Sequence, residues 1–427
     1  MKRVTFYTLG CKVNQYDSEA MLECFLKAGY KSVDFSEIAD VYVINTCIVT
    51  ATGEKKSRQM IRRAKRQNPD AAIVVAGCLA QREAEKLLAQ GVTLVIGNAN
   101  RGKVVELLES ARQSEKALSA VENLTRTNYE ELTVSGHFDR TRAALKIQEG
   151  CDRFCSYCII PYVRGGIRSR KVDDIRHEAY RIEKQGLQEI VLTGIHLTSY
   201  GRDLDGETLV EAIRAAAFPE GIKRVRLGSL EPVVVTEGFA QELSQIPELC
   251  PQFHLALQSG SDSVLFRMRR RYTTEEFSHA VAILRRFFPG CAITTDLIAG
   301  FPGETEEEHQ QSLAFCKAIG FSRIHVFPYS KREGTLAAKM PSQLDRKTKE
   351  RRARELIGLQ EELSFNYART LLGTTQEVLF ENDRDGGAEG YTPTYMRVFA
   401  KGAKSGDIIK VKLVNYQDER FTGEIGG

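Results

Sequence analysis

The chain has 427 residues, of which 42% are hydrophobic and 27% charged, as in a globular protein rather than a disordered one. Its length favours two or three domains, and it has no apolar run of about 18 residues that could span a membrane. The net charge of +4 does not by itself indicate a nucleic-acid partner. The first residues, MKRVTFYTLG, lack a secretion signal, so we expect a cytoplasmic protein.

Short apolar strands alternate with amphipathic helices over residues 1–112. The expected strands and helices are Val4–Leu9, Ser18–Ala28, Val41–Thr46, Glu54–Gln67, Ile73–Ala76 and Leu94–Ile96. This alternation predicts right-handed βαβ units and an N-terminal α/β domain with a Rossmann- or flavodoxin-like parallel sheet. Ligands of such sheets bind beyond the carboxyl ends of the strands.

A polar segment at 113–136 is expected to be a linker to a second alternating series, residues 137–368. Its expected strands are Ile147–Glu149, Ile190–Thr193, Val225–Gly228, His254–Leu257, Thr294–Ile298 and His325–Phe327. Six strand–helix repeats predict a central (β/α) barrel, open or closed, with its site on the loops after the strands. A long charged helix, Arg346–Leu371, is expected to leave this barrel.

The last residues, 369–427, contain short strands separated by Gly and Asp. The expected strands are Thr375–Phe380, Tyr395–Ala400, Asp407–Val414 and Arg420–Glu424. This pattern predicts a small antiparallel β-barrel, a shape that often binds RNA.

The segment GCDRFCSYC places Cys151, Cys155 and Cys158 in a C-x₃-C-x₂-C loop after the first barrel strand. Cysteine thiolates are the standard ligands of iron–sulfur clusters, and three of them leave one iron free to bind a substrate. A zinc site would need four protein ligands, and the next Cys or His along the chain is as far away as His177. A cluster is therefore the better interpretation.

This loop resembles the radical S-adenosylmethionine superfamily. The resemblance implies that the open iron binds S-adenosylmethionine and reduces it, giving a 5′-deoxyadenosyl radical. It also implies a set of cofactor-binding residues, namely Tyr157, Thr193, Gly194, Gln258, Ser259 and Asp296. Gly and polar residues at strand ends are also ordinary turn residues, so these positions are less specific than the cysteines.

Three further cysteines, Cys11, Cys47 and Cys78, each follow an expected strand of the N-terminal sheet. Their spacing alone favours independent burial as small apolar side chains. Gly10 and Gly77 precede two of them, however, which is expected where the backbone approaches an inorganic cluster closely.

The segments TLGCKVNQYDSE, INTCIVTATGEKKSR and AGCLAQ resemble the N-terminal domain of the methylthiotransferases, and GYTPTYMRVFA resembles their TRAM domain. The resemblance covers the whole chain and implies two 4Fe–4S clusters, the auxiliary one on Cys11, Cys47 and Cys78. One S-adenosylmethionine would supply the radical and a second the methyl group. The product would be a methylthio group on carbon, because radicals can replace C–H bonds that ions cannot.

The segments GCKVN and MRRRYTTEE resemble the branch that acts at C2 of N6-threonylcarbamoyladenosine 37 in tRNA; the isopentenyl-adenosine branch typically has GCQMN. Basic residues at 55–66 and 267–271 agree with tRNA. The threonylcarbamoyl carboxylate requires a cation, and the candidates are Arg164, Arg226, Lys331 and Arg332. We also expect a monomer that receives electrons from a flavodoxin or ferredoxin.

Four alternatives stay open at this point. Two are other members of the family, which act on isopentenyl-adenosine in tRNA or on an aspartate of a ribosomal protein. The third is a radical enzyme with one cluster, in which the N-terminal cysteines are structural. The fourth is an RNA-binding module without catalysis, in which both cysteine sets hold zinc.

Overall fold

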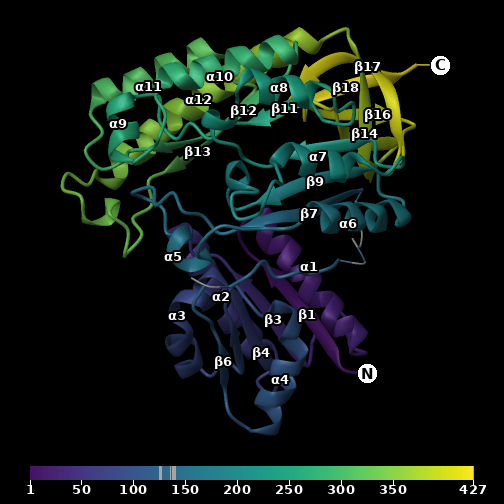
Figure 1. Ribbon diagram of the computed structural model, residues 1–427, viewed down its shortest axis with the longest axis vertical. Helices are drawn as coiled ribbons and strands as arrows, with labels where there is room; N and C mark the ends of the chain where they lie inside the picture. Colours follow the sequence, from purple (N-terminus) through teal and green to yellow (C-terminus); the bar gives the residue numbers. More distant parts are fainter. Residues whose placement is uncertain (125–126, 135, 137–140, 427) are drawn as a thin grey trace.

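The computed structural model describes residues 1–124, 127–134, 136 and 141–426. An N-terminal α/β region lies below a larger barrel region, and a small C-terminal barrel lies beside the upper region (Figure 1). The expected boundary between 136 and 137 borders residues outside the described ranges. Of the helices that fall within them, none has the length and apolar character needed to cross a membrane.

The N-terminal region is a parallel sheet in the order β2-β1-β3-β4-β5-β6, which confirms the predicted fold. Its strands are β1 (Arg3–Thr8), β2 (Lys31–Ser32), β3 (Val41–Thr46), β4 (Ala72–Gly77), β5 (Leu94–Ile96) and β6 (Leu118–Ala120). β3 and β4 are buried along their whole length, because helices cover both faces of the sheet. β6 falls in the segment expected as a linker and pairs with β5.

Four helices cover this sheet: α1 (Lys12–Lys27), α2 (Ala51–Gln67), α3 (Cys78–Ala89) and α4 (Val104–Gln113). α1 begins six residues earlier than its apolar pattern predicted, directly after Cys11. The polar residues of its first turns are buried by contacts with the barrel region: Asn14 accepts a hydrogen bond from Arg164, and Asp17 accepts one from Lys146. Apolar periodicity cannot predict such a turn, because its buried face is polar.

The central region is an open barrel of six parallel strands. They are β7 (Arg142–Glu149), β9 (Glu189–Gly194), β10 (Arg224–Leu227), β11 (Gln252–His254), β12 (Ala292–Ala299) and β13 (Arg323–Pro328). β8 (Arg168–Ser169) adds an antiparallel edge to β7. Single bridges, Val225 to Leu249 and Leu230 to Leu255, join the β7–β10 sheet to the β11–β13 sheet. Among the described residues β13 does not pair with β7, so the barrel is open there.

Helices surround this barrel and bury its apolar core. They are α5 (Ile160–Arg164), α6 (Val172–Lys184), α7 (Leu209–Ala217), α8 (Glu237–Ser244), α9 (Asp262–Arg267), α10 (Thr274–Phe287) and α11 (Glu306–Ile319). The long helix α12 (Arg346–Leu371) has the bounds that were predicted from its charged sequence.

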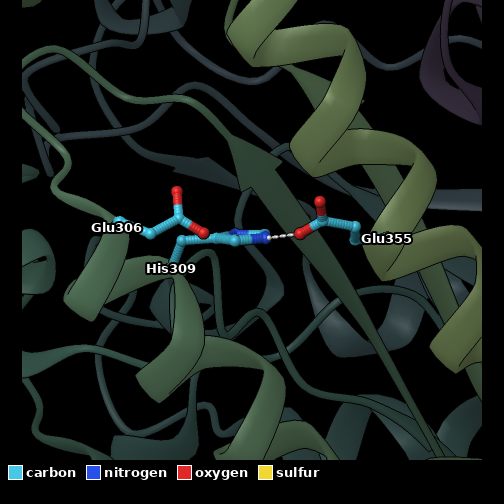
Figure 2. Close-up of side chains that lie close together, drawn as sticks. All are labelled: Glu306, His309 and Glu355. Carbon is cyan, nitrogen blue, oxygen red and sulfur yellow. Dashed lines mark hydrogen bonds and ion pairs between the residues drawn. The ribbon is translucent and has the colours of Figure 1, made fainter.

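An ion-pair network holds α12 against α11. Figure 2 shows His309 of α11 between Glu306 and Glu355, and His309 Nε2 lies 2.7 Å from Glu355 Oε2. The two carboxylates also bind Arg351, each at 2.6 Å. A cation at this point would be repelled by the guanidinium, so the group is a structural contact between helices.

The C-terminal region is a closed barrel in the order β14-β15-β16-β18-β17. Its strands are β14 (Thr375–Arg384), β15 (Gly387–Tyr391), β16 (Arg397–Lys401), β17 (Ile408–Gln417) and β18 (Arg420–Ile425). Four of its pairings are antiparallel as predicted, but β16 and β18 are parallel. β15 was not predicted, because GAEGY has low strand propensity and is held by pairing on both sides.

Candidate functional site

The structure brings Cys11, Cys47 and Cys78 together beyond the carboxyl ends of strands of the N-terminal sheet. They follow β1, β3 and β4, which pair as direct neighbours. Gly10 has a φ of +101°, and a Cβ there would lie 3.2 Å from Sγ of Cys47. A side chain at position 10 would therefore fill the space between the loops.

Burial, together with the charged forms of Cys78 and Cys11, raises the pKa of Cys47 to about 11. Burial also raises the pKa of Cys11, while the nearby guanidinium of Arg164 lowers it. The Nε of Arg164 donates to Sγ of Cys78 at 3.3 Å. Three neighbouring thiols that repel one another as anions, next to one fixed cation, suit a positively charged group that would displace their protons.

The radical motif, with Cys151, Cys155 and Cys158, forms the loop that follows β7. Burial raises the pKa of Cys151 to about 11 and that of Cys158 to about 12, and the charged form of Cys155 raises both. The backbone N–H of Arg153 donates to Sγ of Cys151 at 3.5 Å. The three thiols therefore share one small volume, as the C-x₃-C-x₂-C spacing predicted.

The separation of the sulfurs bears on which metal group fits. Among the described residues, ligand atoms that all lie within 4.8 Å of one another occur only at Glu306, His309 and Glu355. A single tetrahedral zinc, with Zn–S bonds of about 2.3 Å, needs sulfurs about 3.8 Å apart. In each cysteine set at least one pair of sulfurs is therefore more than 4.8 Å apart, which is too wide for three ligands of one zinc ion and leaves room for a multi-iron cluster.

Glu231, in the loop after β10, lies at the centre of the charged groups around the radical motif. It forms ion pairs with Arg270 at 2.8 Å and with Arg153 and His196, both at 3.2 Å. Burial alone would raise the pKa of Glu231, but His196 and Arg270 outweigh burial and hold it at about 2. No local motif surrounds Glu231, so its place in this site could not be predicted from the sequence.

Arg270 also contacts the motif directly, because its Nη1 donates to Sγ of Cys155 at 3.2 Å. The basic run 267–271 agrees, by its sequence, with a tRNA partner. In the structure, two members of this run make contacts within the protein. Arg270 is buried against the motif, and Arg267 pairs with Glu308 at 2.6 Å.

Arg164 belongs to a buried network that joins the N-terminal region to the barrel. Its members are Asp17, Arg101, Lys146, Glu149 and Arg164. All five side chains are at most 3% exposed, and each is paired with an opposite charge. Arg164 is therefore enclosed by protein groups and is not available to bind a substrate carboxylate.

The other three carboxylate candidates lie in different surroundings. Arg332 binds Glu54 at 2.8 Å, and Lys331 lines a separate cavity of about 560 Å³. Arg226 faces the barrel interior but is held by Glu189 at 2.8 Å. None of the four candidates thus combines a free charge with the central cavity.

That central cavity has a volume of about 630 Å³ and lies where all three regions meet. Its wall includes Cys11 and Lys12 from the N-terminal region, and Arg226 and His254 from the barrel. The C-terminal barrel contributes Tyr391 and Tyr395, whose rings stack with centroids 4.9 Å apart and planes at 22°. A cavity of this size with an aromatic wall can hold a nucleoside.

Of the six residues expected to bind S-adenosylmethionine, three lie at or next to the wall of this cavity and three do not. Thr193 and Gly194 line the cavity directly. Oδ2 of Asp296 lies 3.3 Å from Nε2 of His254, which is a residue of the cavity wall. Three others lie away from the wall: Tyr157 packs with Phe301 and Tyr329, Ser259 hydrogen-bonds Ser312, and Gln258 has a φ of +70° between β11 and α9.

Comparisons with known proteins agree with this arrangement. Residues 3–97 match a family described as "Uncharacterized protein family UPF0004", and residues 145–316 match the radical SAM superfamily. The chain is 44% identical to "Threonylcarbamoyladenosine tRNA methylthiotransferase MtaB" of Bacillus subtilis (strain 168), over 97% of this chain and 94% of that protein. The chain belongs to the radical SAM methylthiotransferase family. The cofactors of this methylthiotransferase are S-adenosylmethionine and two 4Fe–4S clusters.

The methylthiotransferase is also similar to a second tRNA-modifying enzyme and to a solved structure. It is 34% identical to "tRNA-2-methylthio-N(6)-dimethylallyladenosine synthase" of Natranaerobius thermophilus, over 98% of this chain and 96% of that protein. The structure of the radical S-adenosylmethionine methyltransferase TsrM from Kitasatospora setae, with cobalamin and a [4Fe-4S] cluster bound, superposes with a TM-score of 0.58. That match has 16% identity and covers 79% of this chain and 77% of TsrM, so it supports the fold.

Proposed function

We propose that this enzyme is a tRNA (N6-L-threonylcarbamoyladenosine-C2)-methylthiotransferase that modifies position 37, beside the anticodon. The observation that carries the proposal is the 44% identity, over nearly the whole of both chains, to the Bacillus subtilis enzyme with that substrate in its name. The relative named for dimethylallyladenosine is less similar, at 34%.

When bound, the two clusters and S-adenosylmethionine supply the radical, the sulfur and the methyl group. Cys11, Cys47 and Cys78 hold the auxiliary cluster in this proposal, and Cys151, Cys155 and Cys158 hold the cluster that binds S-adenosylmethionine. Arg164 and Arg270 stabilise one thiolate of each set, because each already donates a hydrogen bond to it. The expected S-adenosylmethionine contacts are Tyr157, Thr193, Gly194, Gln258, Ser259 and Asp296.

The central cavity supports this assignment, because its wall includes Cys11, a proposed ligand of the auxiliary cluster, together with residues of the barrel interior. An unstacked adenosine entering the cavity would meet the stacked rings of Tyr391 and Tyr395. Residues 369–427 then act as a TRAM-like domain on the anticodon stem, 1–112 as the auxiliary-cluster domain and 137–368 as the radical domain. We further propose a cytoplasmic monomer reduced by a flavodoxin or ferredoxin.

The test uses anticodon stem-loop RNAs that differ only at position 37, with reconstituted enzyme, S-adenosylmethionine and a reductant under anaerobic conditions. We expect the RNA with threonylcarbamoyladenosine to gain the mass of one methylthio group. RNAs with dimethylallyladenosine or unmodified adenosine should not change. Conversion of the dimethylallyl RNA in preference to the threonylcarbamoyl RNA would overturn the substrate assignment.

A further inference from the structure

Lys12 occupies a position where all three regions of the chain meet. It is the first residue of α1, directly after Cys11, and its side chain lines the central cavity of about 630 Å³. It also lines a smaller adjoining cavity of about 280 Å³, together with Arg142 and Glu381. Lys12 keeps an accessible surface, which faces these two cavities.

The arginines that line the central cavity already have carboxylate partners. Arg226 pairs with Glu189 at 2.8 Å, Arg323 with Glu419 at 3.4 Å, and Arg397 with Glu389 at 2.9 Å. No carboxylate within the described parts of the chain lies within 4.0 Å of the ammonium of Lys12. Among the lysine and arginine residues that line the cavity, Lys12 is therefore the one without an ion-pair partner in the described parts of the chain.

The other charged groups next to Lys12 do not neutralise its positive charge either. Arg142 pairs with Glu381 at 2.8 Å, and Arg226 pairs with Glu189 at the same distance. These two arginines and two glutamates neutralise one another, which leaves the ammonium as the uncompensated charge. An ammonium partly shielded from water in this way favours an anionic partner that can accept its hydrogen bonds.

We propose that Lys12 binds the carboxylate of the N6 substituent and thereby distinguishes threonylcarbamoyladenosine from adenosines with an uncharged substituent. The inference rests on the proposed function, which makes the substituent an anion. Cys11 precedes Lys12, so an adenine held by this contact lies beside the auxiliary site. A backbone phosphate of the RNA carries the same kind of charge, and the test separates the two sources.

The experiment measures the dissociation constants of three anticodon stem-loop RNAs by fluorescence anisotropy. They carry threonylcarbamoyladenosine, dimethylallyladenosine or adenosine at position 37 and are otherwise identical. For Lys12→Gln we expect the threonylcarbamoyl RNA to bind about 10- to 100-fold more weakly, with the other two RNAs unchanged. Lys12→Met should behave alike, and Lys12→Arg should keep the preference of the parent. The control Lys116→Gln removes an exposed charge beyond the end of α4 and should change nothing.

Two results would overturn the assignment of Lys12. Equal weakening for all three RNAs would identify a phosphate contact, and unchanged binding would show that Lys12 makes no contact. Iron content and the visible spectrum of each variant are compared with the parent, which detects damage to the auxiliary site. A parent that does not prefer the threonylcarbamoyl RNA would refute the proposed function itself, whereas a preference retained by Lys12→Gln refutes only the role of Lys12.

Discussion

The Nε of Arg164 lies 3.3 Å from Sγ of Cys78, although Cys78 belongs to the N-terminal region and Arg164 to the barrel. The Nη1 of the same guanidinium binds Glu149 at 2.8 Å, two residues before Cys151. One side chain therefore connects the auxiliary cysteines to the strand that leads into the radical motif. A second arginine, Arg270, has the matching role at Cys155.

Replacing Arg164 should damage both the fold and the auxiliary site. In Arg164→Met, Glu149 and Asp17 lose a buried partner, and we expect the free energy of unfolding to fall by about 3–5 kcal/mol. The variant should also bind less iron, because Cys78 loses the guanidinium that donates a hydrogen bond to its Sγ. Urea unfolding and iron analysis test this, with Arg176→Met, a 41% exposed arginine of α6, as control. Full iron content and stability in Arg164→Met would contradict the expectation.

Iron analysis of cysteine variants should reveal two independent clusters. The reconstituted parent is expected to hold about eight irons per chain, and the Cys151→Ala, Cys155→Ala, Cys158→Ala variant about four. The corresponding triple variant of Cys11, Cys47 and Cys78 should also hold about four. The control Cys250→Ala, at a buried cysteine outside both sets, should keep about eight. About four irons in the parent and none in the radical-motif variant would instead assign the N-terminal cysteines a structural role.

Glu231 should make stability depend on pH in the acid range. Its pKa lies near 2 in the folded protein, below the ordinary 4.5, so its ionised form stabilises the fold above about pH 4.5. That contribution, about 3 kcal/mol, is lost as the pH falls from about 4.5 to 2. The unfolding free energy of the parent should therefore fall more steeply over this range than that of Glu231→Gln. If the unfolding free energies of the parent and of Glu231→Gln change in parallel with pH, this prediction is refuted. The control is Glu237→Gln, at an exposed carboxylate, whose unfolding free energy should change with pH as that of the parent does.

Gly77 should tolerate no side chain, since its φ is +90° and a Cβ would lie 2.4 Å from Oδ1 of Asn45 and 2.7 Å from the carbonyl oxygen of Thr46. We expect Gly77→Ala to lower the free energy of unfolding by more than about 2 kcal/mol, through strain and collision together. Gly29→Ala is the matched control, because Gly29 has a φ of +82° but nothing within 4 Å. Its cost should be about 1 kcal/mol, from strain alone. Equal effects in thermal unfolding would rule out the collision at Gly77.

Sequence reasoning predicted the parallel sheet, the open barrel and α12, because strand and helix periodicities are local and alternate regularly in this chain. It proposed one cysteine set from the C-x₃-C-x₂-C loop and the other from the resemblance to the methylthiotransferases. It did not identify Glu231 or Lys12, because their roles depend on which loops meet in the fold. The N-terminal turn of α1 and the strand β15 were missed for the same reason, since their partners are distant in sequence.

The five-member network around Arg164 has a consequence for how such enzymes can be recombined. Its charges come from α1, the 3₁₀ turn after β5, β7 and α5. Asp17 and Arg101 of the N-terminal region balance each other, whereas Lys146, Glu149 and Arg164 of the barrel leave one positive charge that, within this network, only Asp17 can neutralise. A chimaera that joins this N-terminal region to the barrel of a relative would bury unpaired charges unless all five residues are matched. The two cysteine sites are therefore one exchangeable unit rather than two modules.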